Sequence, residues 1–204
     1  MARRRVALAL SMAALAAALA AAAWVHNART KHRTAHREEP DLPVLHSAPP
    51  FELIDSDNRE FSGESLADSV WVIGFFSARC EESCVVMNAN VSKAAAEFSG
   101  TSGLQFVSVS IDPDNDTPEI LKAYAARFSA DTRMWHFLTG PAETIHLLAA
   151  KGFKLGRLDD PTEHSSRLVL VDRTGHIRGY YDGIDPSQMQ RLIKDIRSLL
   201  AARG

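Results

Sequence analysis

Cysteine is nearly absent from this chain of 204 residues, which holds only Cys80 and Cys84. A secreted scaffold that depends on disulfides carries many more cysteines, so that class of protein is excluded. Excess positive charge is missing too: the net charge is −2, which leaves no basic footprint for binding nucleic acid. Two cysteines four positions apart in an otherwise cysteine-free chain predict one local thiol site.

Charged residues are absent from positions 6–25, directly after the three arginines of positions 3–5. About 20 apolar residues let a helix cross the hydrocarbon core of a bilayer, and arginines before the helix favour a cytoplasmic N-terminus. We therefore expect residues 1–25 to form an uncleaved single-pass anchor in the cytoplasmic membrane, with the following domain facing the periplasm. A cleaved signal peptide, cut near the alanines of 21–23, is the alternative. No cysteine lies nearby, which excludes lipid attachment at this point.

The next segment, residues 26–50, has no long apolar run. It predicts a semi-extended polar tether that leads to a domain of residues 51–204. Its prolines are Pro40, Pro43, Pro49 and Pro50, and its histidines are His26, His32, His36 and His46. These histidines are irregularly spaced and have no cysteine among them, which favours a solvated linker over a segment that collects metal ions.

Strand patterns alternate with helix patterns through the domain. Apolar runs and turn residues predict a hairpin over 51–61 and strands over 71–76, 104–111, 135–138, 167–171 and 177–181. Amphipathic spacing and cap residues predict helices over 84–98, 117–128, 141–151 and 186–202. Alternation of this kind predicts an α/β fold in which helices cover both faces of a mixed sheet.

Cys80 lies in the loop that follows the predicted strand 71–76, and Cys84 falls in the first turn of the predicted helix. Ligands of open α/β sheets bind beyond the carboxyl ends of the strands. The unpaired amide groups of a helix N-terminus stabilise a thiolate, which is the form that attacks disulfides and binds metals. The pair is therefore suited to redox exchange, to copper binding, or to both.

A metal ion held by two thiolates needs a further ligand, and a thiolate–imidazole set suits copper or zinc. Of the eight histidines, His164 stands out because it comes directly before the predicted strand 167–171. His136 enters a short strand, His146 lies on the apolar stripe of a helix, and His176 falls in a turn. His164 is therefore the candidate third ligand.

These motifs, taken together over 51–202, resemble those of the SCO/SenC family of copper proteins that help to assemble cytochrome c oxidase. The matching pieces are the cysteine loop CEESC over 80–84, the run VSVSIDP over 107–113 with DTP over 116–118, and His164 before LVLVD over 168–172. The resemblance implies a thioredoxin-like fold with an N-terminal membrane anchor.

The resemblance also implies a function and a site. By the resemblance, we expect Cys80, Cys84 and His164 to hold one copper ion, with Asp112 near the site but outside the ligand set. The implied role is that of a copper chaperone that delivers the ion to subunit II of cytochrome c oxidase. The chain departs from the family pattern, since Glu81 and Val85 stand where the family usually has proline.

A second reading is an enzyme, a thiol–disulfide oxidoreductase that keeps the cysteines of the acceptor reduced. Cys80 would attack the disulfide and Cys84 would resolve the mixed disulfide, while His164 would be dispensable. A peroxidase is a weaker third reading, because it needs a single peroxidatic cysteine in another loop setting.

Overall fold

The computed structural model describes residues 42–155 and 166–202. The predicted anchor, residues 1–25, and most of the predicted tether, residues 26–41, lie outside these ranges. In the part of the chain that the structure describes, no helix has the length and apolar character needed to span a bilayer.

One mixed sheet organises the described residues, with the strand order β1-β8-β7-β4-β5-β6-β2-β3. Its strands are β1 (His46–Ser47), β2 (Glu52–Asp55), β3 (Glu60–Ser62), β4 (Val70–Phe76), β5 (Leu104–Ser110), β6 (Trp135–Thr139), β7 (Arg167–Val171) and β8 (His176–Asp182). Strands β4, β5 and β6 run parallel, and the remaining neighbours pair antiparallel. The predicted mixed sheet is therefore confirmed, and the hairpin predicted over 51–61 is β2–β3.

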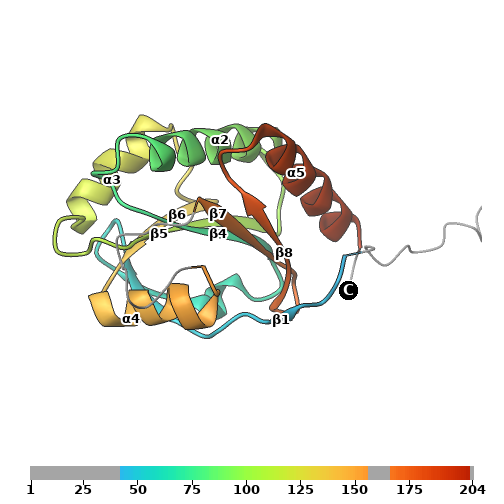
Figure 1. Ribbon diagram of the computed structural model, residues 1–204, viewed down its shortest axis with the longest axis horizontal. Helices are drawn as coiled ribbons and strands as arrows, with labels where there is room; N and C mark the ends of the chain where they lie inside the picture. Colours follow the sequence, from blue (N-terminus) through green and yellow to red (C-terminus); the bar gives the residue numbers. More distant parts are fainter. Residues whose placement is uncertain (1–41, 156–165, 203–204) are drawn as a thin grey trace, which may run out of the picture. The chain divides into compact units, whose positions relative to one another are not determined.

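The helices are α2 (Ser83–Glu97), α3 (Pro118–Arg127), α4 (Ala142–Leu147) and α5 (Pro186–Ala201). Figure 1 shows α2, α3 and α5 on one face of the sheet and α4 on the opposite face. The helix predicted over 141–151 is α4 and a π-helical turn, η2 (Leu148–Gly152), that continues it. A 3₁₀ turn, η1 (Gly63–Leu66), precedes β4.

Strand β4 explains why the two apolar layers form. Every residue of its sequence VWVIGFF is buried, because β5 and β7 pair with its two edges and helices cover both of its faces. Val72 and Phe76 pack in one apolar cluster, whereas Trp71 and Ile73 pack in the other. A continuous apolar run is typical of a strand buried on both faces.

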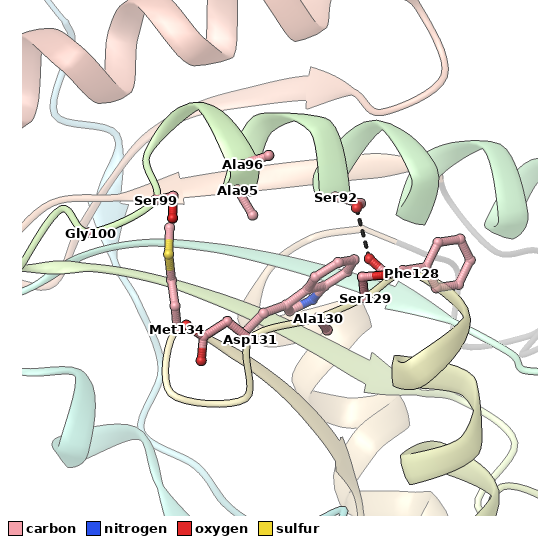
Figure 2. Close-up of a pocket in the computed structure, with 11 residues that line it drawn as sticks. Ser92, Ala95, Ala96, Ser99, Gly100, Phe128, Ser129, Ala130, Asp131 and Met134 are labelled. Atoms are coloured by element: carbon pink, nitrogen blue, oxygen red, sulfur yellow. Dashed lines mark hydrogen bonds between the residues drawn. The ribbon is translucent and has the colours of Figure 1, made fainter.

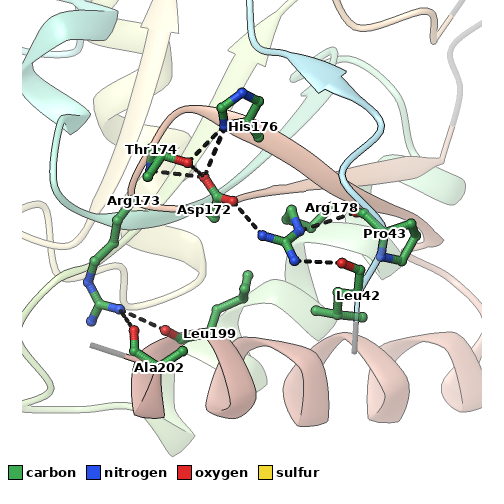
Figure 3. A network of polar contacts seen from close by, with 9 residues as sticks. All are labelled: Leu42, Pro43, Asp172, Arg173, Thr174, His176, Arg178, Leu199 and Ala202. Atoms are coloured by element: carbon green, nitrogen blue, oxygen red, sulfur yellow. Dashed lines mark hydrogen bonds and ion pairs between the residues drawn. The ribbon is translucent and has the colours of Figure 1, made fainter. Parts of the chain in front are cut away.

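Part of the predicted tether belongs to the domain. Strand β1, at residues 46–47, pairs with β8, so that His46 lies opposite Ile177. Arg178 donates to the backbone carbonyls of Leu42 and Pro43 and pairs with Asp172 at 2.7 Å, as Figure 3 shows. The short strand escapes sequence analysis because it is only two residues long and its pairing is with a distant segment.

The Asp172–Arg178 pair fixes where the chain joins the sheet. Asp172 follows β7, which is antiparallel to β4 with Val171 opposite Trp71 near the start of β4. In the same turn, Arg173 donates to the carbonyls of Leu199 and Ala202 at the end of α5 (Figure 3). Residues 42–47 therefore join at the edge of the sheet opposite the carboxyl end of β4.

Replacing Arg178 with alanine should destabilise the domain by about 3 kcal/mol, because breaking a buried pair leaves the Asp172 carboxylate without its counter-charge. The two side chains are only 12% and 10% exposed. Arg133→Ala is the matched control, since the Arg133–Asp131 pair is 89% and 51% exposed and such pairs contribute at most ~1 kcal/mol. Urea unfolding measures both variants, and equal losses would contradict a structural role for the buried pair.

Candidate functional site

The two cysteines meet where β4 runs into α2. Cys80 is half-buried in the loop between them, and Cys84 is the second residue of α2 and only 3% exposed. The backbone N–H of Cys84 donates to the Sγ atom of Cys80 at 3.3 Å. The Ser83 hydroxyl lies 3.6 Å from the same sulfur. The structure thus confirms the predicted placement of both cysteines at a strand end and a helix start.

The two thiols differ in acidity because their surroundings differ. Burial raises the pKa of Cys80, but hydrogen bonds from Cys84, from Ser83 and from the backbone of Glu82 outweigh it, so the net pKa is lowered. Burial, with the hydrogen bond to Cys80 as a second cause, raises the pKa of Cys84 to about 12. Cys80 is therefore the accessible nucleophile, and Cys84 keeps its proton until a metal ion or a base displaces it.

Asp112 approaches the site through Arg79, the residue before Cys80. Its Oδ2 atom lies 2.7 Å from Nη2 of Arg79 and accepts from Nε at 2.8 Å. Its Oδ1 atom accepts from the side-chain amide of Asn115. The carboxylate thus neutralises the cation of the cysteine loop, and among the described residues no hydrogen bond joins Asp112 to either sulfur.

Asp116 is a site residue that the sequence alone does not identify. The sequence suggests Asp116 or Thr117 as the cap of α3, and Thr117 is the cap, accepting from the N–H of Ile120. Asp116 is fully buried instead, and its Oδ2 atom accepts from the N–H of Ala78 at 2.9 Å and from the hydroxyl of Ser110. This carboxylate therefore fixes the start of the cysteine loop. The sequence gives one hint of this role: Asp116 and Thr117 both suit the N-cap position of α3, and only one of them can occupy it.

A buried polar network holds the other side of the loop. Asn88 is fully buried, and its amide donates to the carbonyl of Cys84 at 3.0 Å and to the Tyr124 hydroxyl at 3.2 Å. Ser108 donates to Asn88 and accepts from the indole of Trp135. Burial raises the pKa of Tyr124 to about 12, so its hydroxyl stays neutral beside the thiols. An asparagine among apolar helix positions is the signal that could have identified this network.

His164 lies outside the described residues, in the range 156–165. Within the ranges that the structure does describe, no group of three or more His, Cys, Asp or Glu side chains is placed to hold a metal ion. His136 contacts Gln105, His146 contacts the carbonyl of Ile111, and His176 contacts Thr174. The three described histidines set aside in the sequence analysis are thus engaged elsewhere.

A separate cavity of about 460 Å³ lies between α2 and the loop that follows α3. Figure 2 shows its lining of small side chains from α2, with Ser92 donating to the carbonyl of Phe128. Trp135 and Met134 line the other side. Neither cysteine reaches this cavity, so it is distinct from the thiol site.

The difference in pKa between the two thiols is tested with two matched variants, Cys84→Ser and Cys80→Ser. In Cys84→Ser, the rate of alkylation of Cys80 should rise with pH through a midpoint below that of a free thiol, because a hydroxyl can replace the thiol donor. In Cys80→Ser, Cys84 should react at least ~10-fold more slowly at neutral pH, since thiolate fraction and exposure set reactivity. Iodoacetamide labelling followed by mass spectrometry measures both, and equal rates would contradict the assignment of Cys80 as nucleophile.

Comparison with known proteins gives the family. The family model described as SCO1/SenC matches residues 41–201. The "SCO1 protein homolog" of Bacillus subtilis (strain 168) is 30% identical over 162 residues, which cover 76% of this chain and 84% of that protein.

Solved structures agree. BsSco, a member of the Sco family of cytochrome c oxidase assembly proteins in which a disulfide switch was identified, is 29% identical with a TM-score of 0.69, covering 79% of this chain and 97% of that one. Arabidopsis thaliana ScoI with copper bound is 22% identical with a TM-score of 0.61, covering 74% and 98%, and shows the fold alone. The fold is thioredoxin-like, and the chain belongs to the SCO1/SenC family.

Proposed function

We propose that this protein is a copper chaperone that assists assembly of the copper site of cytochrome c oxidase. The observation that carries the proposal is the thiol pair, in which the N–H of Cys84 donates to the sulfur of Cys80 at 3.3 Å at the start of α2. Two soft sulfur donors four residues apart suit copper. Membership of a family that includes cytochrome c oxidase assembly proteins supports the same function.

The proposed ligands are Cys80, Cys84 and His164, which together hold one copper ion as cargo. Binding displaces the proton of Cys84, whose pKa is about 12, so copper uptake is coupled to proton release. Cys80 is the more exposed of the two cysteines and exchanges first with a thiolate of the acceptor. His164 controls release, because only its neutral imidazole is a ligand.

The proposed acceptor is subunit II of cytochrome c oxidase, and the proposed location is the periplasmic side of the cytoplasmic membrane. Support for the location is the uncharged run over 6–25 after three arginines. The mass of the mature protein tests the anchor. A mature N-terminus near Trp24 would show that the N-terminal segment is a cleaved signal peptide and not an anchor.

A second candidate function, thiol–disulfide oxidoreductase, is favoured by the unequal acidities of the two thiols. The Cys80 thiolate would attack a disulfide of the acceptor, forming a mixed disulfide and releasing one acceptor thiolate. Cys84 would then attack the Cys80 sulfur and release the second acceptor thiol. Two electrons pass to the acceptor, and a disulfide between Cys80 and Cys84 remains.

If the protein binds copper as proposed, it should take up one copper ion per chain. When its thiols are reduced and Cu(II) is added, thiolate-to-Cu(II) charge-transfer bands should appear. His164→Ala should remove these bands and lower the affinity at least ~10-fold, because a ligand is lost. His176→Ala is the control, since that imidazole contacts Thr174 in the β7–β8 turn. Metal analysis and absorption spectra measure both variants. Unchanged spectra in His164→Ala would exclude His164 as a ligand.

The two functions separate in a reduction assay with a copper chelator present. An oxidoreductase should reduce a disulfide peptide that models the acceptor, and His164→Ala should retain that rate because no step uses the imidazole. In this assay a chaperone should show only slow, single-turnover reduction. Loaded with copper and without the chelator, it should transfer one copper ion per chain to the acceptor peptide. Multiple turnovers with a chemical reductant but without copper would favour the enzyme.

A further inference from the structure

The face around Cys80 has an unbalanced charge. Glu81 and Glu82 follow Cys80 directly, and both are exposed. The β5–α3 loop faces the cysteine loop, since Asp116 accepts from the N–H of Ala78 at 2.9 Å, and it adds the exposed carboxylate of Asp114. Glu119, also exposed, lies in the first turn of α3.

Among the described residues, two cations near these acids are already paired with other carboxylates. Arg79 pairs with Asp112 at 2.7 Å, so that pair is neutral. Lys122 of α3 pairs with Asp57 at 2.7 Å. Arg167, the exposed first residue of β7, adds one positive charge to the balance. Since Glu81, Glu82, Asp114 and Glu119 are all exposed and outnumber this one cation, the described residues around Cys80 present net negative charge.

Apolar side chains accompany the carboxylates on this face. Val86 in the first turn of α2 is 48% exposed, and Ile120 in the first turn of α3 is 47% exposed. Both helices begin at the carboxyl ends of their preceding strands and lie on the same face of the sheet (Figure 1). Free metal ions and small thiols gain nothing from exposed valine and isoleucine, whereas the core of a protein interface does.

We propose that Glu81, Glu82, Asp114, Val86 and Ile120 form a docking surface around Cys80 for a protein partner that is positively charged around its own thiols. The inference rests on the proposed function, because it names the class of partner for the same site. Opposite charges on two docking faces raise the association rate. Since the effect acts over about a Debye length, it weakens as salt is added.

The test uses the reduced full-length chain and two peptides of equal length, each with one cysteine activated as a 2-thiopyridyl disulfide. Lysines flank the cysteine in one peptide and glutamates flank it in the other. The Cys80 thiolate attacks the peptide sulfur, the disulfide between peptide and pyridine breaks, and pyridine-2-thione leaves with the electron pair and takes up a proton. Release of this chromophore gives the rate for each peptide.

The lysine peptide should react about tenfold faster than the glutamate peptide at low ionic strength, and the ratio should approach one at high salt. In E81Q/E82Q/D114N the ratio should fall at least ~3-fold. The ratio is insensitive to the thiolate fraction of Cys80, because both peptides meet the same thiolate. The matched control E64Q/D68N/E97Q removes equal charge before β4 and at the end of α2, and it should keep the ratio of the unaltered chain.

A ratio that is the same in E81Q/E82Q/D114N as in the unaltered chain, or that falls equally in the control, would overturn the docking surface. A change confined to the rate of copper uptake, with no preference between peptides, would assign the acids to metal collection and overturn it as well. Copper stoichiometry, measured on the same samples, tests the proposed copper binding separately, since it depends on the copper ligands and not on the docking surface.

Discussion

Burial of β4 on both faces is the constraint on which the rest of the structure depends. All seven of its residues are buried, so the strand must lie between β5 and β7 and under helices on both sides. After its last residue, Phe76, the chain must leave the sheet at the carboxyl end of the strand. The cysteine loop emerges there, next to the loop after the parallel strand β5, and both loops supply residues to one site.

Hydrogen bonds turn this loop into a chemical site. Asp116 holds the N–H of Ala78, and Asn88 holds the carbonyl of Cys84, so the loop is fixed at its start and at its end. Between these points the N–H of Cys84 donates to the Cys80 sulfur. Each buried polar group is costly to leave unpaired. The position of the sulfur therefore follows from backbone groups that the fold must satisfy.

The unequal acidity of the two thiols suits both copper transfer and disulfide reduction. In both proposed functions the more acidic, more exposed Cys80 begins the exchange, with an acceptor disulfide or with an acceptor thiolate that takes the copper ion, and the buried Cys84 completes it. The carboxylates of the proposed docking surface act at longer range, because their charge favours the approach of a positively charged partner. In these proposals, binding chemistry and partner choice thus lie in separate residues around the same site.

The sequence by itself determined the α/β class, the strand and helix order, and the place of both cysteines, because apolar periodicity and cap residues are local signals. The tertiary structure decided what depends on distant segments. It joined residues 42–47 to the sheet through Arg178, chose Thr117 over Asp116 as the cap of α3 and used Asp116 to hold the cysteine loop, and made Cys84 the less acidic thiol by burying it. Such effects arise from burial and from hydrogen bonds between residues far apart in the chain, which no local pattern encodes.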